Sequence, residues 1–328
     1  MAENNFSSFF KGLDKLRNKM AGFIARIPYR HIAVIGRIVG LLIYYADVRH
    51  RRIVRRNLSF AYPDWTQTQI REMAGRVFQN LGITLMEICQ MICLSGDEIM
   101  KKVKINGEEH VREALDYHKG VVLVSAHLGN WEVVPLYWPL YFKTPIAVVA
   151  RELEGKIIDH WVCRLRSRFG SEVIYKETAM PEMIRALRAD KALAILIDQG
   201  TKSSLGVKIK FFDRYVTATS GAALLAMRCK SPVLPGFCIR NGDGTFTLHL
   251  SKPMFLKRTG DLRGDLAENT QAMTDSIEAM VRQYPEQWFW VHKRWRKYYP
   301  FLYPEDIARR KARREKKNKK RAREGSAA

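Results

Sequence analysis

The chain has 328 residues, of which 47% are hydrophobic, and a formal net charge of +23. This length and apolar content suit one large folded domain or two smaller ones, and they exclude a wholly disordered chain. The stretch from Arg309 to Glu324 contains eleven Lys and Arg and two Glu, so it carries +9 and the rest of the chain carries +14. Such an excess of positive charge favours an acidic partner: nucleic acid, an anionic membrane, or an acidic protein or substrate.

The first sixty residues combine an apolar stretch with many arginines. The first 20 residues lack the apolar core and small-residue cleavage site of a signal peptide. The most apolar stretch, Ile32 to Ala46, contains Arg37. As a helix it would be about 22 Å long, short of the roughly 30 Å of a membrane's hydrocarbon core. We therefore expect residues 1–60 to form a membrane-associated helical region that lies on the bilayer or enters it shallowly. The alternative is a helix of the folded core.

Farther along, Thr66–Leu94 has apolar residues at helical spacing, and short β-rich runs then alternate with amphipathic stretches. The β-rich runs are Val103–Ile105, Val121–Ser125, Ile146–Val149, Val173–Tyr175 and Ala192–Ile197. The helical stretches lie near 108–117, 130–141, 155–169 and 179–189. Nearly continuous apolar strands separated by helices predict an α/β fold with a central, largely parallel mixed sheet flanked by helices.

The later part of the chain predicts three more strands, Val207–Phe212, Val233–Ile239 and Thr245–Leu250. The turn sequence at 241–244 joins the last two as a hairpin. A helix is expected near 265–284, ended by a proline. The predicted organisation is thus a helical region at 1–60, a folded α/β domain at 61–304, and a basic, disordered tail at 305–328.

The sharpest candidate site is the segment His127–Glu132, directly after a buried strand run. Gly129 permits a tight turn, and Asn130 is a favourable N-cap for a helix that begins after it. Ligands of such sheets bind at the carboxyl ends of strands, where His127 would lie. Glu132 could reach back to the imidazole, fix its tautomer and leave the other ring nitrogen as a base. The alternative is a surface histidine followed by a glutamate that the helix dipole favours.

A second candidate site is Asp198-Gln199, which also follows an apolar strand. It would lie at the same edge of the sheet and could line the same cleft, although a simple polar turn is equally compatible with it. Arginines are suited to binding phosphate and other anions. Three basic clusters are therefore candidates for holding an anionic substrate, or else are solvated faces: Arg151; Arg164, Arg166 and Arg168; Lys293, Arg294 and Arg296.

The sequence gives less support to a hydrolase or to a metal site. A hydrolase would need a nucleophile on a sharp turn, but no G-x-S-x-G occurs, and Ser125 falls within a strand. No H-E-x-x-H and no zinc-type Cys/His spacing is present. The five cysteines are odd in number and form no C-x-x-C, which favours reduced thiols and a cytoplasmic catalytic region.

Several of these segments recur together in one known family. In chain order they are His127–Glu132, Arg151, Arg164–Arg168, Asp198–Gln199, the region of Thr217 after Phe211-Phe212, and Pro285–Arg294. Over roughly residues 10–300 the chain resembles the late acyltransferases of lipid A assembly, the lauroyl/myristoyl transferases, within the lysophospholipid and glycerolipid acyltransferase superfamily. The H-x-x-x-x-E pattern is shared by the whole superfamily, whereas the closing segment is more specific to the lipid A group.

The resemblance implies an acyltransferase domain at 61–304 whose site faces the cytoplasm at the inner membrane. It implies an acyl-thioester donor, usually acyl carrier protein, an anionic lipid acceptor, and no metal or organic cofactor. By match, His127 is the general base on the acceptor hydroxyl, Glu132 orients it, and the hydroxyl attacks the thioester without an acyl-enzyme. Backbone N–H groups at the helix start near Asn130 would hold the oxyanion. The substrate-binding candidates are Asn130, Arg151, Arg164, Arg166, Asp198 and Gln199.

Two features depart from the family pattern: the short, basic N-terminal apolar segment and the long basic tail. Two alternatives stay open. An enzyme of the same superfamily could acylate a lysophospholipid or another glycolipid. A non-enzymatic basic protein could instead bind membrane or nucleic acid, but this would leave the polar residues at the two strand ends unexplained. We therefore expect a membrane surface as a partner and no nucleic acid.

Overall fold

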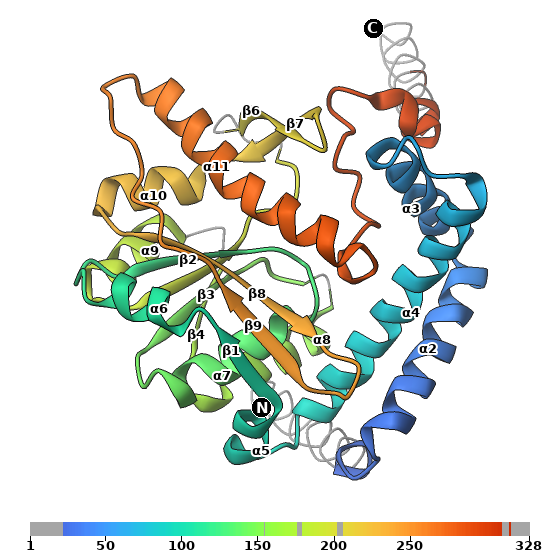
Figure 1. Ribbon diagram of the computed structural model, residues 1–328, viewed down its shortest axis with the longest axis horizontal. Coiled ribbons are helices and arrows are strands. Elements are labelled where there is room, and N and C mark those ends of the chain that lie inside the picture. Colours follow the sequence, from blue (N-terminus) through green and yellow to red (C-terminus); the bar gives the residue numbers. More distant parts are fainter. Residues whose placement is uncertain (1–21, 154, 176–178, 202–205, 310–314, 316–328) are drawn as a thin grey trace, which may run out of the picture.

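The computed structural model describes residues 22–153, 155–175, 179–201, 206–309 and 315 (Figure 1). Most of the basic stretch from Arg309 to Glu324, and the first 21 residues, lie outside these ranges. The helices are α2 (Tyr29–Ala46), α3 (Val48–Ala61), α4 (Gln67–Met91), α5 (Gly96–Lys102), α6 (Glu108–Leu115), α7 (Val134–Tyr141), α8 (Lys156–Arg166), α9 (Ala179–Arg188), α10 (Gly221–Cys229) and α11 (Leu262–Gln283). Short 3-10 turns are η1 (Trp131–Val133), η2 (Ser167–Phe169), η3 (Pro285–Gln287) and η4 (Pro300–Leu302).

A seven-stranded mixed sheet forms the centre of the molecule, in the order β1-β9-β8-β2-β5-β3-β4. Its strands are β1 (Val103–Asn106), β2 (Val121–Ser125), β3 (Ile146–Ala150), β4 (Glu172–Tyr175), β5 (Ala192–Leu196), β8 (Val233–Arg240) and β9 (Phe246–Leu250). Every neighbouring pair is parallel except the β8–β9 hairpin. The prediction of an α/β fold with a largely parallel sheet is confirmed.

Strand β2 explains why the sheet has a core on each face. Its side chains alternate, so Val122 and Val124 enter one hydrophobic cluster while Val121 and Leu123 enter the other. The first cluster includes residues of α9, α10 and α11, and the second includes residues of α5, α6 and α7. Figure 1 shows α11 on one side of the sheet and α7 on the other. Burial on both faces accounts for the nearly continuous apolar strands in the sequence.

The register of β2 and β5 positions the candidate site. Val121 pairs with Ala192, and Ser125 pairs with Leu196, so these two parallel neighbours end together. The segments that leave their carboxyl ends therefore emerge side by side.

Two strands stand apart from the sheet. β6 (Gly206–Phe211) and β7 (Arg214–Thr219) pair antiparallel as a separate hairpin. β7 and α10 were not predicted, because the first is a short polar-rich strand and the second is dominated by small residues. β6, by contrast, was predicted within one residue of its bounds.

The N-terminal helices pack beside the sheet (Figure 1). α2 approaches α4 closely through glycines: a Cβ on Gly82 would lie 2.1 Å from the carbonyl oxygen of Gly36. The opposite side of α2 exposes large apolar side chains, including Val34, Ile38 and Leu42. No single described helix is long and apolar enough to cross a membrane, but α2 and α3, bent by 97°, meet that criterion as a pair. The membrane association of residues 1–60 stays a prediction, as does the division into three regions.

Candidate active site

The two segments that leave β2 and β5 meet through a histidine and an aspartate. Nδ1 of His127 lies 2.8 Å from Oδ1 of Asp198, and the backbone N–H of His127 donates to Oδ2 of the same carboxylate at 3.1 Å. The indole N–H of Trp288 donates to Oδ2 from a third direction at 2.9 Å. Three donors thus hold a carboxylate whose side chain is only 2% exposed.

These contacts set the charge states of the pair. Burial opposes ionisation of Asp198, but the positive charge and hydrogen bond of His127 outweigh it and lower the pKa of Asp198 to about 2. Burial also disfavours a charged His127, yet the nearby carboxylates of Asp198 and, more weakly, Glu132 leave the pKa of His127 raised. An ionised Asp198 can only accept, so Nδ1 of a neutral His127 carries the hydrogen and Nε2 keeps its lone pair.

Neighbouring aromatic rings fix the plane of the imidazole. The ring centroid of His127 lies 5.0 Å from that of Trp131 and 5.9 Å from that of Phe289. The N–H of Phe289 donates to the carbonyl of His127 at 2.9 Å. The imidazole is nevertheless 23% exposed. No described residue hydrogen-bonds Nε2, so this nitrogen is available to a substrate hydroxyl.

The turn after His127 needs the glycine that follows. Gly129 has φ 64°, and a Cβ there would lie 2.0 Å from the carbonyl oxygen of Cys238. The chain then enters η1 and α7, as expected for a helix that begins after residue 130. The expectation that Asn130 caps this helix is wrong: its side chain donates to Glu87 at 3.0 Å and makes no cap hydrogen bond.

Glu132 does not orient His127 by a hydrogen bond, which corrects the prediction from the sequence. Its carboxylate accepts two hydrogen bonds from Arg166 on α8, at 2.8 and 2.6 Å, and a third from the indole of Trp131 at 3.0 Å. Both members of this ion pair are largely buried, with 7% and 15% of their side chains exposed. The bidentate guanidinium holds Glu132 toward α8, and Asp198 takes the place beside the ring because β5 neighbours β2.

A second buried ion pair, between Arg240 and Glu87, supports the turn that follows His127. Arg240, at the end of β8, donates to Glu87 through Nε at 2.5 Å and Nη2 at 2.6 Å. Nη2 also donates to Thr84 at 2.6 Å, and Asn130 bonds the same glutamate. The carbonyl and N–H of Arg240 bond the side chain of Gln287. This network joins α4, β8, the His127 turn and the C-terminal segment, so it positions the site without touching the imidazole.

The remaining predicted site residues divide into two groups. The structure brings together His127 and Asp198, with Gln199 following, partly buried. Arg151 and Arg164 are exposed, and no described contact places them at the imidazole. Among the described residues, no group of three or more His, Cys, Asp or Glu is arranged to hold a metal ion. All five cysteines are free thiols.

Sequence reasoning missed three contributors: the roles of Trp288 and Glu87, and the buried Arg240. A sequence signal exists for Arg240, because an arginine at the end of a fully apolar strand must find a carboxylate partner. No such signal exists for Trp288, whose contact with Asp198 joins residues 90 positions apart.

The sequence is similar to those of known proteins. Over residues 10–297 the sequence matches the bacterial lipid A biosynthesis acyltransferases. The chain belongs to this family. A Haemophilus influenzae lipid A biosynthesis acyltransferase is 22% identical over 270 residues, 82% of each chain. An Escherichia coli lipid A biosynthesis lauroyltransferase is 26% identical over 280 residues, 83% of this chain and 88% of the relative.

Another relative, a phosphatidylinositol mannoside acyltransferase of Mycolicibacterium smegmatis, is 25% identical over 190 residues, 57% of this chain and 60% of the relative. The protein is an acyltransferase, and the family resemblance seen in the sequence is confirmed.

Proposed function

We propose that this acyltransferase moves a fatty acyl chain from an acyl thioester to a hydroxyl of a lipid A precursor, with His127 as the general base. The observation that carries the proposal is the His127–Asp198 pair at the joint carboxyl end of β2 and β5, with Nε2 turned to accept a proton. Membership of the lipid A family supports the acceptor.

The chemistry follows from the tautomer of His127. The acceptor hydroxyl donates to Nε2, and its oxygen attacks the thioester carbonyl carbon as the proton passes to the imidazole. The imidazolium that forms is stabilised by Asp198. When the tetrahedral intermediate collapses, the C–S bond breaks and the imidazolium returns the proton to the leaving thiolate. The products are an ester and a free thiol, and no acyl-enzyme forms.

Glu132 contributes to this step through its charge. Its carboxylate raises the pKa of His127 from a distance, although Asp198 contributes more. The hydrogen bonds from Arg166 keep that charge in a fixed position. The N–H of Asn130 is not available to an oxyanion, since it donates to the carbonyl of Cys238 at 2.9 Å. We therefore propose that Asn130 supports the turn and that its N–H does not bind the oxyanion.

We further propose acyl carrier protein as the donor and the cytoplasmic face of the inner membrane as the location. Acyl carrier proteins are acidic, and the basic chain offers them a complementary surface. The exposed apolar face of α2, next to the arginine-rich α3, is suited to a membrane interface. If so, replacing Ile38 and Leu42 by asparagine should release the protein from vesicles while leaving turnover in detergent unchanged. Unaltered vesicle binding would argue against this face.

The direct test incubates the purified enzyme with labelled acyl-acyl carrier protein and a panel of lipid acceptors. Product mass identifies the acceptor and the acyl chain. Acylation of a lipid A precursor, and little acylation of a lysophospholipid, is the expected result. Because one relative is named a phosphatidylinositol mannoside acyltransferase, a mannosylated phospholipid belongs in the panel. Its preferential acylation would replace lipid A as the proposed acceptor.

A further inference from the structure

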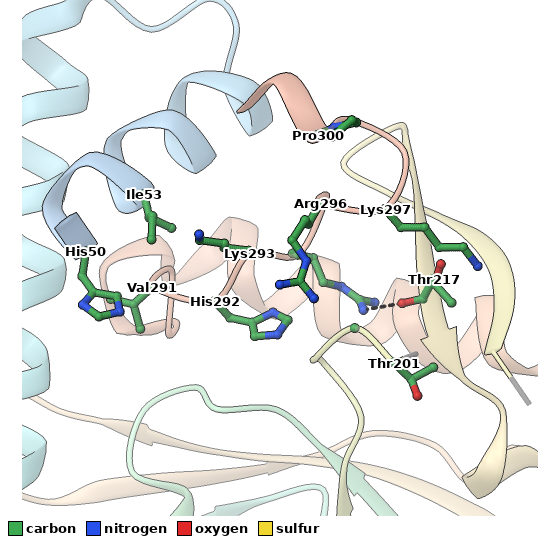
Figure 2. Close-up of a pocket in the computed structure, with 12 residues that line it drawn as sticks. His50, Ile53, Thr201, Thr217, Val291, His292, Lys293, Arg296, Lys297 and Pro300 are labelled. Carbon is green, nitrogen blue, oxygen red and sulfur yellow. Dashed lines mark hydrogen bonds between the residues drawn. The ribbon is translucent and has the colours of Figure 1, made fainter. Parts of the chain in front are cut away.

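A cavity of about 570 Å³ runs along the segment 291–297, and Figure 2 draws the residues that line it. Its wall is built from α3, the loop after β5, β7 and the segment 291–297. Gly200, two residues after Asp198, lines it, and Asp198 acts electrostatically on both His292 and Arg294 of its wall. The cavity therefore adjoins the proposed catalytic site but is lined by other residues.

Several buried polar atoms of residues that line this cavity have no hydrogen-bond partner among the described residues. Arg294 is only 3% exposed, and it donates through Nη1 to the carbonyl of Thr217 at 3.0 Å. Its Nε and Nη2 atoms have no hydrogen-bond partner within the described part of the chain. The same holds there for the hydroxyl of Thr217, which is also 3% exposed, and for Nδ1 of His292. A buried donor left unpaired is costly, so such a cluster indicates a ligand.

The charge of the wall indicates an anionic ligand. Among the described residues, the lining includes Lys293, Arg294, Arg296 and Lys297 and no carboxylate. Lys293 is neutralised by Glu305 and Asp306, and Asp306 also lies 3.5 Å from Arg296.

Arg294 gains no such partner among the described residues, and burial lowers its pKa to about 10. Burial also lowers the pKa of His292 to about 4. A bound anion would offset the free-energy cost of burying the charged guanidinium of Arg294.

We propose that this cavity binds the phosphate group of a phosphorylated lipid acceptor. Two nitrogens of the planar guanidinium of Arg294, Nε and Nη2, have no partner among the described residues, and their N–H groups match the geometry of phosphate oxygens. Figure 2 shows His292 and Arg296 directed toward each other from the same segment, above the loop that carries Thr201. The hydroxyl of Thr217 adds a neutral donor.

The surroundings favour a lipid headgroup over another phosphate source. His50 and Ile53 of α3 line the cavity, and α3 follows directly on α2, whose outer face is apolar. A lipid whose chains lie against α2 would present its headgroup at this wall. The inference rests on the proposed function, because it assumes that the acceptor is a membrane lipid acylated at His127.

The test compares a phosphorylated acceptor with the same lipid after phosphatase treatment, in detergent, at saturating donor. For the wild type, removal of the phosphate should raise KM about 10- to 100-fold, as expected for lost hydrogen bonds to a charged group. Arg294→Gln should raise KM by a similar factor for the phosphorylated lipid alone. Arg296→Gln should give a smaller rise in KM for the phosphorylated lipid. Because the side chain of Arg296 is 37% exposed, this variant should fold even if Arg294→Gln does not. Lys252→Gln, an exposed lysine away from the cavity, is the matched control for charge.

Several outcomes would overturn the inference. It is contradicted if the wild type has the same KM for the two lipids, or if the variants raise KM equally for both. A rise in KM for the acyl donor instead would assign the cavity to the phosphodiester of the donor's prosthetic group.

A titration with inorganic phosphate, followed by ³¹P line broadening, separates this inference from the proposed function. Broadening by the wild type that Arg294→Gln or Arg296→Gln abolishes supports the anion site even if no lipid is acylated. Equal broadening by wild type and both variants contradicts it.

Discussion

Asp198 and Glu132 are both buried carboxylates that act on His127, but they are held in opposite ways. Asp198 accepts hydrogen bonds from an imidazole, a backbone N–H and an indole, which are neutral until His127 is protonated. Glu132 is already neutralised by the guanidinium of Arg166. A carboxylate whose countercharge appears only during the reaction stabilises the reacting state selectively. One with a permanent partner does not, but its removal would leave the partner's charge buried and unpaired.

The largest loss of activity is expected from replacing His127, the residue on which both carboxylates act. A positioned general base contributes about 10²–10⁴-fold, so His127→Ala should lower kcat/KM on that scale. The fold should survive, because the ring is partly exposed at the end of a strand. The measurement is acyl transfer in detergent, with a thermal melt to verify folding. A folded variant with nearly normal turnover would exclude the general-base mechanism.

Asp198→Asn should come next. It keeps the shape but removes the charge and permits the wrong tautomer, a change that costs roughly 10⁴-fold in a Ser-His-Asp triad. We expect a loss of about 10²-fold or more here, and the double variant with His127→Ala should be little worse than His127→Ala alone, as for residues that act as a unit.

The chain offers a matched control for this aspartate. His118 and Asp190 form a comparable contact at 3.2 Å, but on the surface. Asp190→Asn should leave turnover unchanged. If Asp198→Asn behaved like Asp190→Asn, the pairing of His127 with Asp198 would have no catalytic meaning.

Replacing Glu132 should affect stability more than activity, the reverse of what is expected for Asp198. Glu132→Gln removes a more distant charge, and we expect about a tenfold loss of kcat/KM, since an opposite charge is worth roughly one to three pKa units only at close range. Glu132→Ala leaves Arg166 buried without its carboxylate. Breaking such a pair costs up to about 3–5 kcal/mol of unfolding free energy.

Urea unfolding measures that cost, and Arg166→Met added to Glu132→Ala should recover part of it, because the unpaired charge is gone. If folded Glu132→Gln lost as much activity as Asp198→Asn, Glu132 would orient the imidazole of His127, as its spacing in the sequence predicts.

The same contrast explains what could be predicted from the sequence. Apolar runs predicted strand ends at Ser125 and Ile197, within one residue of the observed ends, and parallel topology then brings His127 and Asp198 to one edge. Local patterns were sufficient there because the periodicity of a buried strand is itself local.

Partners across the fold were not predictable in this way. H-x-x-x-x-E places Glu132 near His127 in the chain, but the direction of its side chain depends on Arg166, 34 residues away on α8. The same is true of Asn130, which Glu87 of α4 draws away from the helix cap. The direction of a side chain that bonds a residue far away in the sequence depends on tertiary packing, which local sequence patterns do not reveal.

The smallest expected effect, and the most discriminating, is on the pH profile. His127 must be neutral to accept a proton, so kcat/KM falls as pH drops through its pKa. Burial lowers that pKa, but Asp198 and then Glu132 outweigh burial and place it above the ordinary value of 6.5. Removing either negative charge therefore shifts the acid limb to lower pH.

Asp198→Asn should shift the limb further than Glu132→Gln, because Asp198 is the larger of the two raising causes and also forms the hydrogen bond. Profiles of kcat/KM from pH 5 to 9 at constant ionic strength measure both shifts, and Asp190→Asn should leave the limb in place. A larger shift in Glu132→Gln than in Asp198→Asn would reverse the assignment, making Glu132 the carboxylate that governs the base.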